Sequence, residues 1–131
     1  MASRAVATKL RIKSGQRVCV LGAPEGITDA LGLPADIELS TALDGTYDVI
    51  LAFAVRMADL RATVDALRAG LAPNGKLWVS YPKLEAARKR GMASDISRDT
   101  MWSVFREHGL EGVAMISVDE LWSAMRFREA G

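Results

Sequence analysis

The sequence predicts a single α/β domain, in which a mostly parallel sheet carries helices on both faces and ends in an antiparallel hairpin. Two observations lead to this prediction. Apolar runs typical of buried strands alternate with helical patterns along most of the chain, as in proteins with parallel sheets. The last two apolar runs are separated only by Asp119 and Glu120, and so short a link permits only antiparallel pairing.

Composition sets the broad class of the protein. A chain of 131 residues, 50% hydrophobic and 25% charged, is long enough for one domain with a real core. Lys plus Arg number 17 and Asp plus Glu number 16, so no overall field attracts nucleic acid or a membrane surface. No apolar span approaches the ~20 residues of a membrane helix, and the first residues lack the apolar core of a signal peptide. We therefore expect a cytoplasmic protein with no membrane partner and no strong nucleic-acid signal.

The first half of the chain predicts three strands. A turn at Ser14-Gly15 precedes a strand from Arg17 to Leu21, whose continuous apolar residues indicate burial on both faces. Cys19 lies inside this run and is the only cysteine, so we expect a buried, inert thiol and no intramolecular disulfide. The stretch "GITDALGLP" predicts a short helix and "DIELST" a short second strand. A turn at Asp44-Gly45 then leads to a strongly apolar strand from Tyr47 to Phe53.

The clearest helical pattern follows that strand. Apolar residues step by three and four to form one stripe: Met57, Leu60, Val64, Leu67 and Leu71. Gly70 and Pro73 end the predicted helix, and Asn74-Gly75 turns the chain into the strand "KLWVSY". The segment from Pro82 to Ile96 is polar and basic and contains Gly91, so we expect a mobile loop or a frayed helix there.

A second helix is predicted from Ser97, its expected N-cap, to His108, with Gly109 as the stop. Its buried face is expected to consist of Met101, Trp102 and Phe105. His108 is the sole histidine, which excludes paired-histidine metal sites, and at the helix end its positive form would favour the dipole. We therefore assign it a capping role rather than a catalytic one.

The closing hairpin is predicted to have strands at about residues 112–118 and 121–127. Alternation in its second strand places Leu121, Met125 and Phe127 on one side. It places Trp122, Arg126 and Arg128 on the other. An aromatic residue beside two arginines is compatible with a homodimer surface, and equally with a solvated sheet edge.

Basic residues are concentrated in two segments. Residues 1–17 carry five basic side chains and no acid, and a second cluster lies within residues 83–90. Such clusters are more often solvated tails and loops than binding patches, and the sequence leaves their role open. We expect residues 1–13 to form a basic N-terminal extension and residues 14–131 to form the single domain.

Four stretches follow one another along the chain before the predicted hairpin: "VCVLGAPEG", "YDVILAF", "LRAGLAPNGKLWVSYPK" and "FREHGLEGV". Together, over about residues 14–128, they resemble the Rossmann-like fold of class I S-adenosylmethionine-dependent methyltransferases. The stretches "RVCVLGAPEG", "LDGTYDVILAF", "LWVSYPK", "DISRDTMW" and "LWSAMRFR" also resemble a small bacterial domain family of unknown function, over nearly the whole chain. The resemblance implies the fold and says little about the function.

The glycine loop departs from that resemblance. Gly22 and Gly26 are kept, but Ala23, Pro24 and Glu25 separate them, and the pattern G-x-G-x-x-G is absent. Pro24 removes a donor N–H and Glu25 adds a negative charge, so the loop is a poor cradle for phosphate. S-adenosylmethionine carries no phosphate, so Glu25 alone does not exclude it.

Three further expected parts are missing. The resemblance implies an acidic residue at the end of the second strand to hold the ribose, but "IELST" ends in Ser40 and Thr41. Only a turn fits between Thr41 and Tyr47, so one strand–helix unit is missing there, and with it the wall that encloses the adenine. After the central strand, "AFAVRM" supplies no carboxylate that would orient a methyl acceptor. Together these losses favour a degenerate relative that does not methylate.

Ligands of open α/β sheets bind beyond the carboxyl ends of the strands, at the point where the strand order reverses. Three loops are expected to meet there, at residues 22–26, 53–57 and 80–90. The candidate ligand-binding residues are Gly22, Glu25, Gly26, Ser40, Arg56, Tyr81 and Lys83. The alternative is that the glycines serve only backbone geometry and the cations are solvated. The sequence offers no catalytic constellation and no metal-ligand spacing.

Three functions remain open from the sequence. The first is a non-enzymatic binding or regulatory module on a methyltransferase-like scaffold, with no cofactor expected and an unknown small ligand or protein partner. The second is a minimal S-adenosylmethionine-dependent methyltransferase completed by a partner or a second subunit. The third is a structural dimerisation domain, for which a homodimer is expected.

Overall fold

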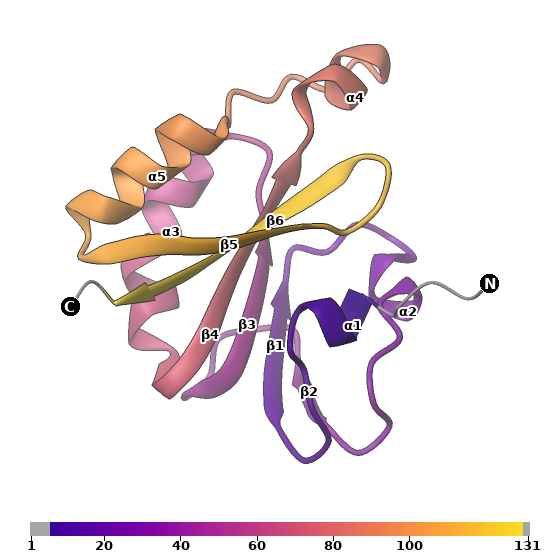
Figure 1. Ribbon diagram of the computed structural model, residues 1–131, viewed down its shortest axis with the longest axis vertical. Helices are drawn as coiled ribbons and strands as arrows, with labels where there is room; N and C mark the ends of the chain where they lie inside the picture. The colour runs from indigo at the N-terminus through magenta and orange to yellow at the C-terminus, as the bar shows by residue number, and fades with distance from the viewer. Residues whose placement is uncertain (1–5, 130–131) are drawn as a thin grey trace.

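The computed structural model describes residues 6–129 and contains one six-stranded mixed sheet of order β2-β1-β3-β4-β6-β5 (Figure 1). The strands are β1 (Arg17–Leu21), β2 (Glu38–Ser40), β3 (Tyr47–Phe53), β4 (Leu71–Pro82), β5 (Leu110–Ser117) and β6 (Trp122–Glu129). The helices are α1 (Val6–Lys9), α2 (Ile27–Ala30), α3 (Met57–Ala69), α4 (Leu84–Lys89) and α5 (Arg98–Glu107). Strands β1 to β4 pair in parallel, and β6 is antiparallel to both of its neighbours. This confirms the predicted α/β fold with a closing antiparallel hairpin.

The strand order reverses between β1 and β3. The connection that follows β1 leads to β2 on one side of it. The chain then returns past β1 to β3, and the connection that follows β3 leads to β4 on the other side, so the connections after β1 and β3 run in opposite directions. Residues 41–46, which connect β2 to β3, form neither a helix nor a strand. One strand–helix unit is therefore missing at this position, as predicted, and β2 is left as a short edge strand.

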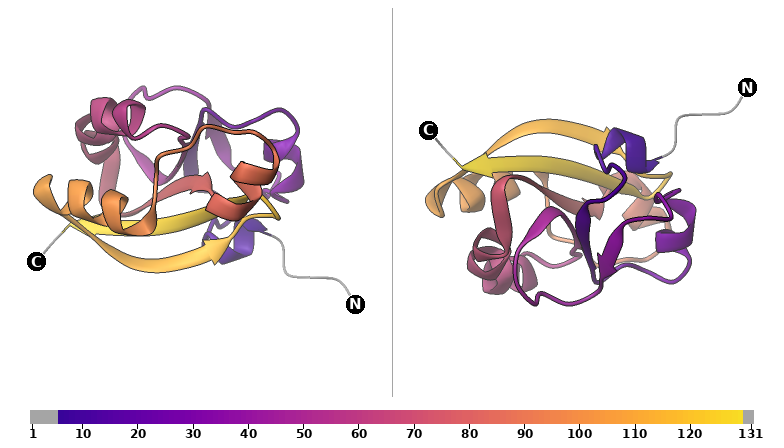
Figure 2. Two further views of the ribbon diagram at one scale, coloured as in Figure 1. Left: turned by 90° about the horizontal axis from the view of Figure 1, so that it is seen from above. Right: turned by 90° about the horizontal axis from the view of Figure 1, so that it is seen from below.

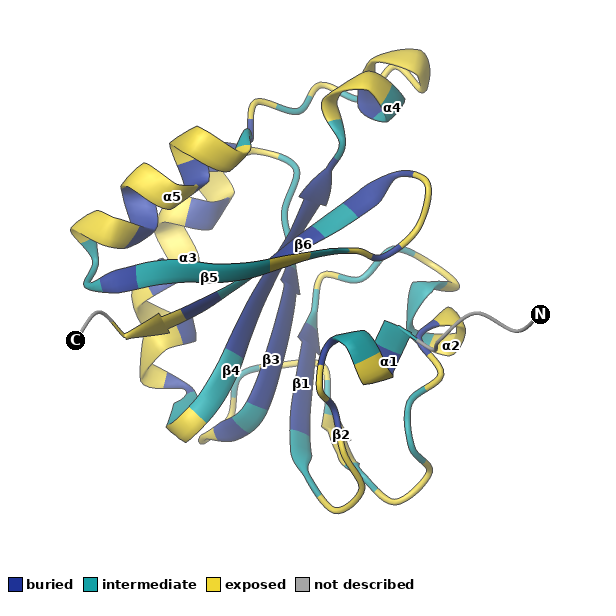
Figure 3. Ribbon diagram, in the orientation of Figure 1, coloured by how far each residue is buried: buried dark blue, intermediate teal, exposed yellow. Residues whose placement is uncertain are grey.

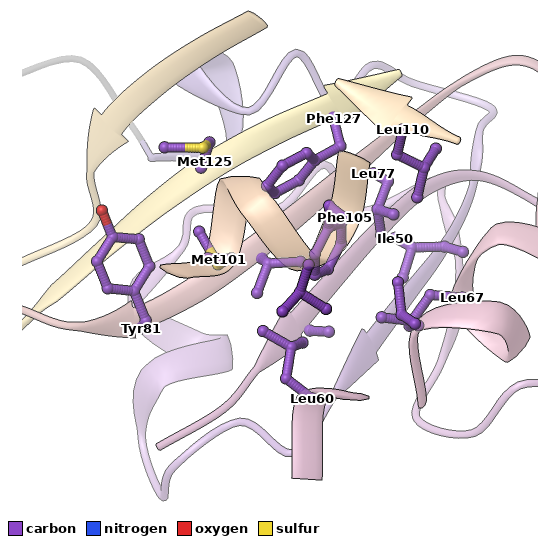
Figure 4. Packing of buried hydrophobic residues seen from close by; sticks show 14 of the residues in the cluster. Ile50, Leu60, Leu67, Leu77, Tyr81, Met101, Phe105, Leu110, Met125 and Phe127 are labelled. Carbon is purple, nitrogen blue, oxygen red and sulfur yellow. The ribbon is translucent and has the colours of Figure 1, made fainter. Parts of the chain in front are cut away.

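Hydrophobic cores cover both faces of the sheet. Helices α3 and α1 lie on opposite sides of it (Figure 2), and each side has its own buried cluster. On the first side, α3 and α5 pack on β3, β4 and β6 (Figure 4). At its centre, the rings of Phe105 and Phe127 stack with centroids 4.1 Å apart. Burial of such aromatic residues is the main source of stability in a domain of this size.

The second cluster ties the N-terminal residues to the sheet. Trp78 on β4 is buried, and its indole N–H donates to the carbonyl oxygen of Leu10 at 2.9 Å. Ala7, Leu10 and Ile12 are themselves buried within this cluster. Residues 6–12, which lie inside the segment predicted as a basic extension, therefore contribute core side chains.

Helix α5 begins as the sequence predicts. The Ser97 hydroxyl accepts from the Thr100 N–H at 3.2 Å, while the Thr100 hydroxyl accepts from the Ser97 N–H at 3.0 Å, which completes a capping box. His108 is the C-cap residue, and its Nδ1 lies 2.8 Å from Oδ1 of Asp65 on α3.

Two predictions about burial are wrong. Trp102 is 41% exposed, because Met101, Val104 and Phe105 form the buried stripe of α5 and Trp102 is turned about 100° from Met101. Figure 3 shows that α5 has both buried and exposed residues. Leu121 packs in the cluster opposite to that of Met125, because it precedes β6 and the alternation of the strand does not extend to it.

The predicted loop or frayed helix from Pro82 contains the short helix α4. In the part of the chain that the structure describes, no helix is both long and apolar enough to cross a membrane.

Candidate functional site

An open pocket of about 450 Å³ lies at the carboxyl ends of β1 and β3, where the strand order reverses. It is lined by Gly22, Pro24, Phe53, Ala54, Val55, Asp59, Met92, Leu121 and Trp122. Gly22 adopts φ +67°, and a Cβ added there would lie 3.2 Å from the carbonyl oxygen of Phe53. Glycine is therefore needed at this position both for its backbone angle and for the close approach of the two strand ends.

Aromatic side chains form one wall of the pocket. Phe53 and Trp122 meet edge to face, with ring centroids 5.2 Å apart and planes at 83°. Trp122 is 4% exposed, so its indole is not available as the exposed dimer contact that the sequence suggested. Asp59 is the only ionisable side chain among the lining residues, so the pocket is mostly apolar.

Met92 lines the pocket, and the residues that follow it are hydrogen-bonded to the segment where α3 begins. The Met57 N–H donates to Oδ1 of Asp95 at 2.7 Å, and the Ser94 hydroxyl donates to the Val55 carbonyl at 2.9 Å. Asp95 thus caps α3 from a distant segment, because Arg56, the residue at the N-cap position, makes no side-chain cap bond. Met92 and Asp95 were not predicted from the sequence. The one available signal was the absence of Ser, Thr, Asn or Asp immediately before the helix.

The predicted residues of the glycine loop and of β2 have different surroundings. Gly22 lines the pocket, whereas Glu25 is exposed and Gly26 is the N-cap of α2 at φ +82°. The Ser40 hydroxyl donates to the Ala42 carbonyl at 2.7 Å and accepts from the Tyr47 hydroxyl at 3.2 Å. Ser40 is therefore engaged in the turn that returns the chain to the start of β3.

The remaining predicted residues lie along the ends of β3 and β4. Arg56 Nε is 3.7 Å from Oδ1 of Asp95. Lys83 Nζ donates to the Ser117 hydroxyl at 2.8 Å and to the Asp119 carbonyl at 2.7 Å, so it ties β4 to the hairpin.

Tyr81 is buried, and its hydroxyl points to the Met115 sulfur at 3.8 Å. Burial raises the pKa of Tyr81, and the positive charge of Arg98 opposes part of that rise. Of the seven predicted residues, Gly22 alone is among those that line the pocket.

Two other ionisable features limit the chemistry of the described residues. Burial raises the pKa of the Cys19 thiol, and this cysteine is fully enclosed in the core, which confirms its prediction as a buried thiol. Residues 6–129 contain no group of three or more His, Cys, Asp or Glu side chains that could hold a metal ion.

No family model and no curated protein matches the chain. Several solved structures do. The N-methyltransferase NodS from Bradyrhizobium japonicum is 17% identical, with 96% of this chain and 90% of that chain covered and a TM-score of 0.59. A methyltransferase from Geobacter sulfurreducens in complex with S-adenosylhomocysteine is 14% identical, with 94% and 88% covered and a TM-score of 0.61.

A third match is a putative methyltransferase of Haloferax volcanii in complex with the Trm112 activator. It is 13% identical, with 96% of this chain and 87% of that chain covered and a TM-score of 0.61. At these identities the likeness concerns the fold. The chain has the Rossmann-like fold of class I S-adenosylmethionine-dependent methyltransferases, as its sequence motifs predict.

Proposed function

We propose that the protein is a ligand-binding module of methyltransferase-like fold that holds an apolar or aromatic group in the pocket at the carboxyl ends of β1 and β3. The observation that carries the proposal is the pocket itself, which combines aromatic walls from Phe53 and Trp122 with a position at the reversal of the strand order. Ligand sites of open α/β sheets occur at this position, and apolar linings with few polar groups are typical of small-molecule sites.

The β2 end of the sheet supports a module that does not methylate by itself. An acidic residue at the end of the second strand holds ribose hydroxyls in dinucleotide-binding folds, whereas β2 ends here in Ser40, whose hydroxyl is engaged with Ala42 and Tyr47. The six-residue connection from Thr41 to Thr46 contains no helix or strand that would enclose an adenine. A ligand in this pocket would therefore gain most from contacts with the apolar wall.

The first experiment uses indole as an aromatic probe and follows backbone amide and indole N–H signals by NMR. We expect millimolar indole to shift the signals of Gly22 and Trp122 in a saturable way. Val55→Trp should fill the pocket and abolish the shift, since Val55 lines it. Leu84→Trp is the matched control, because Leu84 is 51% exposed on α4 and is not a lining residue. Unchanged spectra, or equal shifts in the Val55→Trp variant, would refute the proposal.

A second candidate function is a minimal methyltransferase completed by a partner or a second subunit. Two similar structures favour it: one methyltransferase is in complex with S-adenosylhomocysteine, and another is in complex with an activator protein. S-adenosylhomocysteine at about 100 times its dissociation constant would raise stability by about 2.7 kcal/mol, which is several degrees of melting temperature. We expect no such rise for the isolated chain. A rise accompanied by a shift of the Gly22 signal would favour the methyltransferase over the binding module.

The third function, structural dimerisation, makes a separate prediction. Sedimentation equilibrium of the purified chain would give a dimer mass if this function holds. A monomer at all accessible concentrations would exclude it.

A further inference from the structure

Four basic side chains lie together at the end of the sheet opposite the pocket. We call Arg11, Lys76, Arg126 and Arg128 the cationic patch. The register of β4 and β6 pairs Trp78 with Arg126 and Leu77 with Phe127, and the next step places Lys76 opposite Arg128. Cross-strand partners project from the same face of a sheet, so these side chains share the face on which Trp78 packs under Leu10. Arg11 follows Leu10 directly.

Arg126 is the central member of the cationic patch. Its guanidinium carbon lies 5.9 Å from the centroid of the Trp78 ring. Its Nε is buried and has no hydrogen-bond partner among residues 6–129. Burial lowers the pKa of Arg126, and the positive charges of Arg11 and Arg128 lower it further. A guanidinium stays ionised even so, and the unmet donor is therefore a charged one.

Nearby acids compensate only part of this charge. Glu111 Oε1 lies 2.8 Å from Arg128 Nε, and Glu129 Oε1 lies 3.4 Å from Nε of Arg68 on α3. Within the described residues, neither Lys76 nor Arg126 forms an ion pair. Like charges held close together in partial burial are unfavourable, and an anion placed between them would reverse the sign of this energy.

The backbone around the cationic patch is fixed. Arg11 adopts φ +63°, a left-handed conformation that costs a non-glycine residue about 1 kcal/mol. The buried residues Leu10 and Ile12 on either side hold it there. Within β4, where its pairing with β3 shifts register, a Cβ on Gly75 would lie 2.8 Å from the Ala72 carbonyl oxygen, so this position requires glycine. A preorganised group of donors binds an anion without a large ordering cost.

A hollow of about 240 Å³ opens beside these side chains. Its lining residues are Asn74, Gly75, Lys76, Val113, Arg126, Phe127 and Arg128. Next to it, a wider hollow of about 530 Å³ shares Asn74, Gly75 and Arg128 and is also lined by Glu129, whose carboxylate is engaged with Arg68. This is more room than a single phosphate group needs, so a larger molecule carrying the group also fits.

We propose that the cationic patch binds a phosphate group of an anionic ligand, with Arg126 and Arg128 as the principal donors and Lys76 and Arg11 as supporting charges. Phosphate offers several oxygens to several donors at once, which matches two guanidinium forks and an ammonium better than a single carboxylate does. This site is separate from the pocket at the carboxyl ends of β1 and β3. The proposal for the cationic patch does not depend on the function proposed for that pocket.

The experiment titrates the whole protein with pyrophosphate at constant ionic strength and follows the Trp78 indole N–H signal, since Arg126 lies over that ring. We expect saturable binding that Arg126→Gln weakens by at least about tenfold, as expected for loss of a charge-assisted donor. Lys76→Gln is a second variant that keeps the measurement valid if Arg126→Gln does not fold. Arg61→Gln is the matched control, because Arg61 is an exposed arginine on α3. Binding that is not saturable, that chloride reproduces, or that all three variants weaken equally would overturn the proposal.

A second arm separates the sources of the phosphate group. A short single-stranded oligonucleotide is added to protein saturated with pyrophosphate. If it displaces pyrophosphate and loses affinity in Arg126→Gln, the phosphate belongs to a nucleic acid backbone. If it does not bind while pyrophosphate does, the ligand is a small phosphorylated molecule. The site would be refuted by two results together. The first is oligonucleotide binding that neither displaces pyrophosphate nor changes in Arg126→Gln, and the second is pyrophosphate binding that does not saturate.

Discussion

Replacing Gly22 and Gly26 separately by alanine tests the close approach between Gly22 and the Phe53 carbonyl oxygen at the pocket. Gly22 and Gly26 both have positive φ, at +67° and +82°, so alanine is strained at each by about 1 kcal/mol. The loss of backbone freedom in the unfolded chain is the same for both substitutions and cancels in their difference. What differs is the space around the new Cβ. At Gly22 it would meet the Phe53 carbonyl oxygen at 3.2 Å, and at Gly26 it would meet nothing within 4 Å.

The expected magnitudes follow from this difference. Gly26→Ala should lower the free energy of unfolding by about 1 kcal/mol, and Gly22→Ala by about 2 kcal/mol, since the ends of β1 and β3 must also move apart. An unfolding entropy of about 2.1 cal/mol/K per residue gives about 0.28 kcal/mol/K for 131 residues. The melting temperatures should therefore fall by about 4 °C for Gly26→Ala and about 7 °C for Gly22→Ala.

Urea titration and thermal melts followed by circular dichroism measure both variants against the parent chain. Equal losses at the two positions, or a larger loss at Gly26, would refute the inferred contact between Gly22 and Phe53. The indole titration gives an independent readout. Gly22→Ala should weaken indole binding because Gly22 lines the pocket, whereas Gly26→Ala should leave it unchanged.

Three further predictions concern single positions. Ser97→Ala removes one half of the capping box and should cost about 1 kcal/mol in urea denaturation, whereas Ser103→Ala, exposed on the same helix, should cost almost nothing. Trp78→Phe leaves the Leu10 carbonyl without its donor and opens space in the second core, so the free energy of unfolding should fall by about 3 kcal/mol. Proteolysis before residue 13 should also become faster in this variant. Unchanged cleavage there would contradict the role of this hydrogen bond. Cys19 should resist thiol reagents in the folded protein. Because burial raises its pKa, the folded state keeps the proton that the unfolded thiol releases, so stability should fall as pH rises above about 8.5, less steeply in Cys19→Ala.

The fold was predictable because its strongest signals are local. The continuous apolar residues of β1 and β3 and the stripe of α3 follow directly from burial on both faces of a sheet and on one face of a helix. The link between β5 and β6, predicted as Asp119-Glu120 and comprising residues 118–121 in the structure, is short enough to fix the antiparallel direction of β6 by length alone. Such features need no knowledge of distant residues.

The site was less predictable because its walls come from segments far apart in the chain. Gly22 was predicted from its loop. The orientation of Trp122 was predicted from the alternation within β6, and this alternation gives no information about the contact between Trp122 and Phe53 of β3. Met92 and Asp95 lie in a polar segment without periodicity, and only tertiary packing places them beside α3. Trp102 was assigned to the core because of its residue type, although its helical position turns it outward.

The edge position of β2 connects the open questions about function. Its three residues pair only with β1 on one side, and Leu39 is 43% exposed there. A partner that completes a methyltransferase must supply the missing wall at this edge, so it would cover Leu39 and would have to offer the acidic ribose contact that Ser40 does not supply. A binding module makes no such demand, since Phe53 and Trp122 already form its wall within one chain. The two functions therefore differ in whether the β2 edge must be covered for the pocket to bind its ligand.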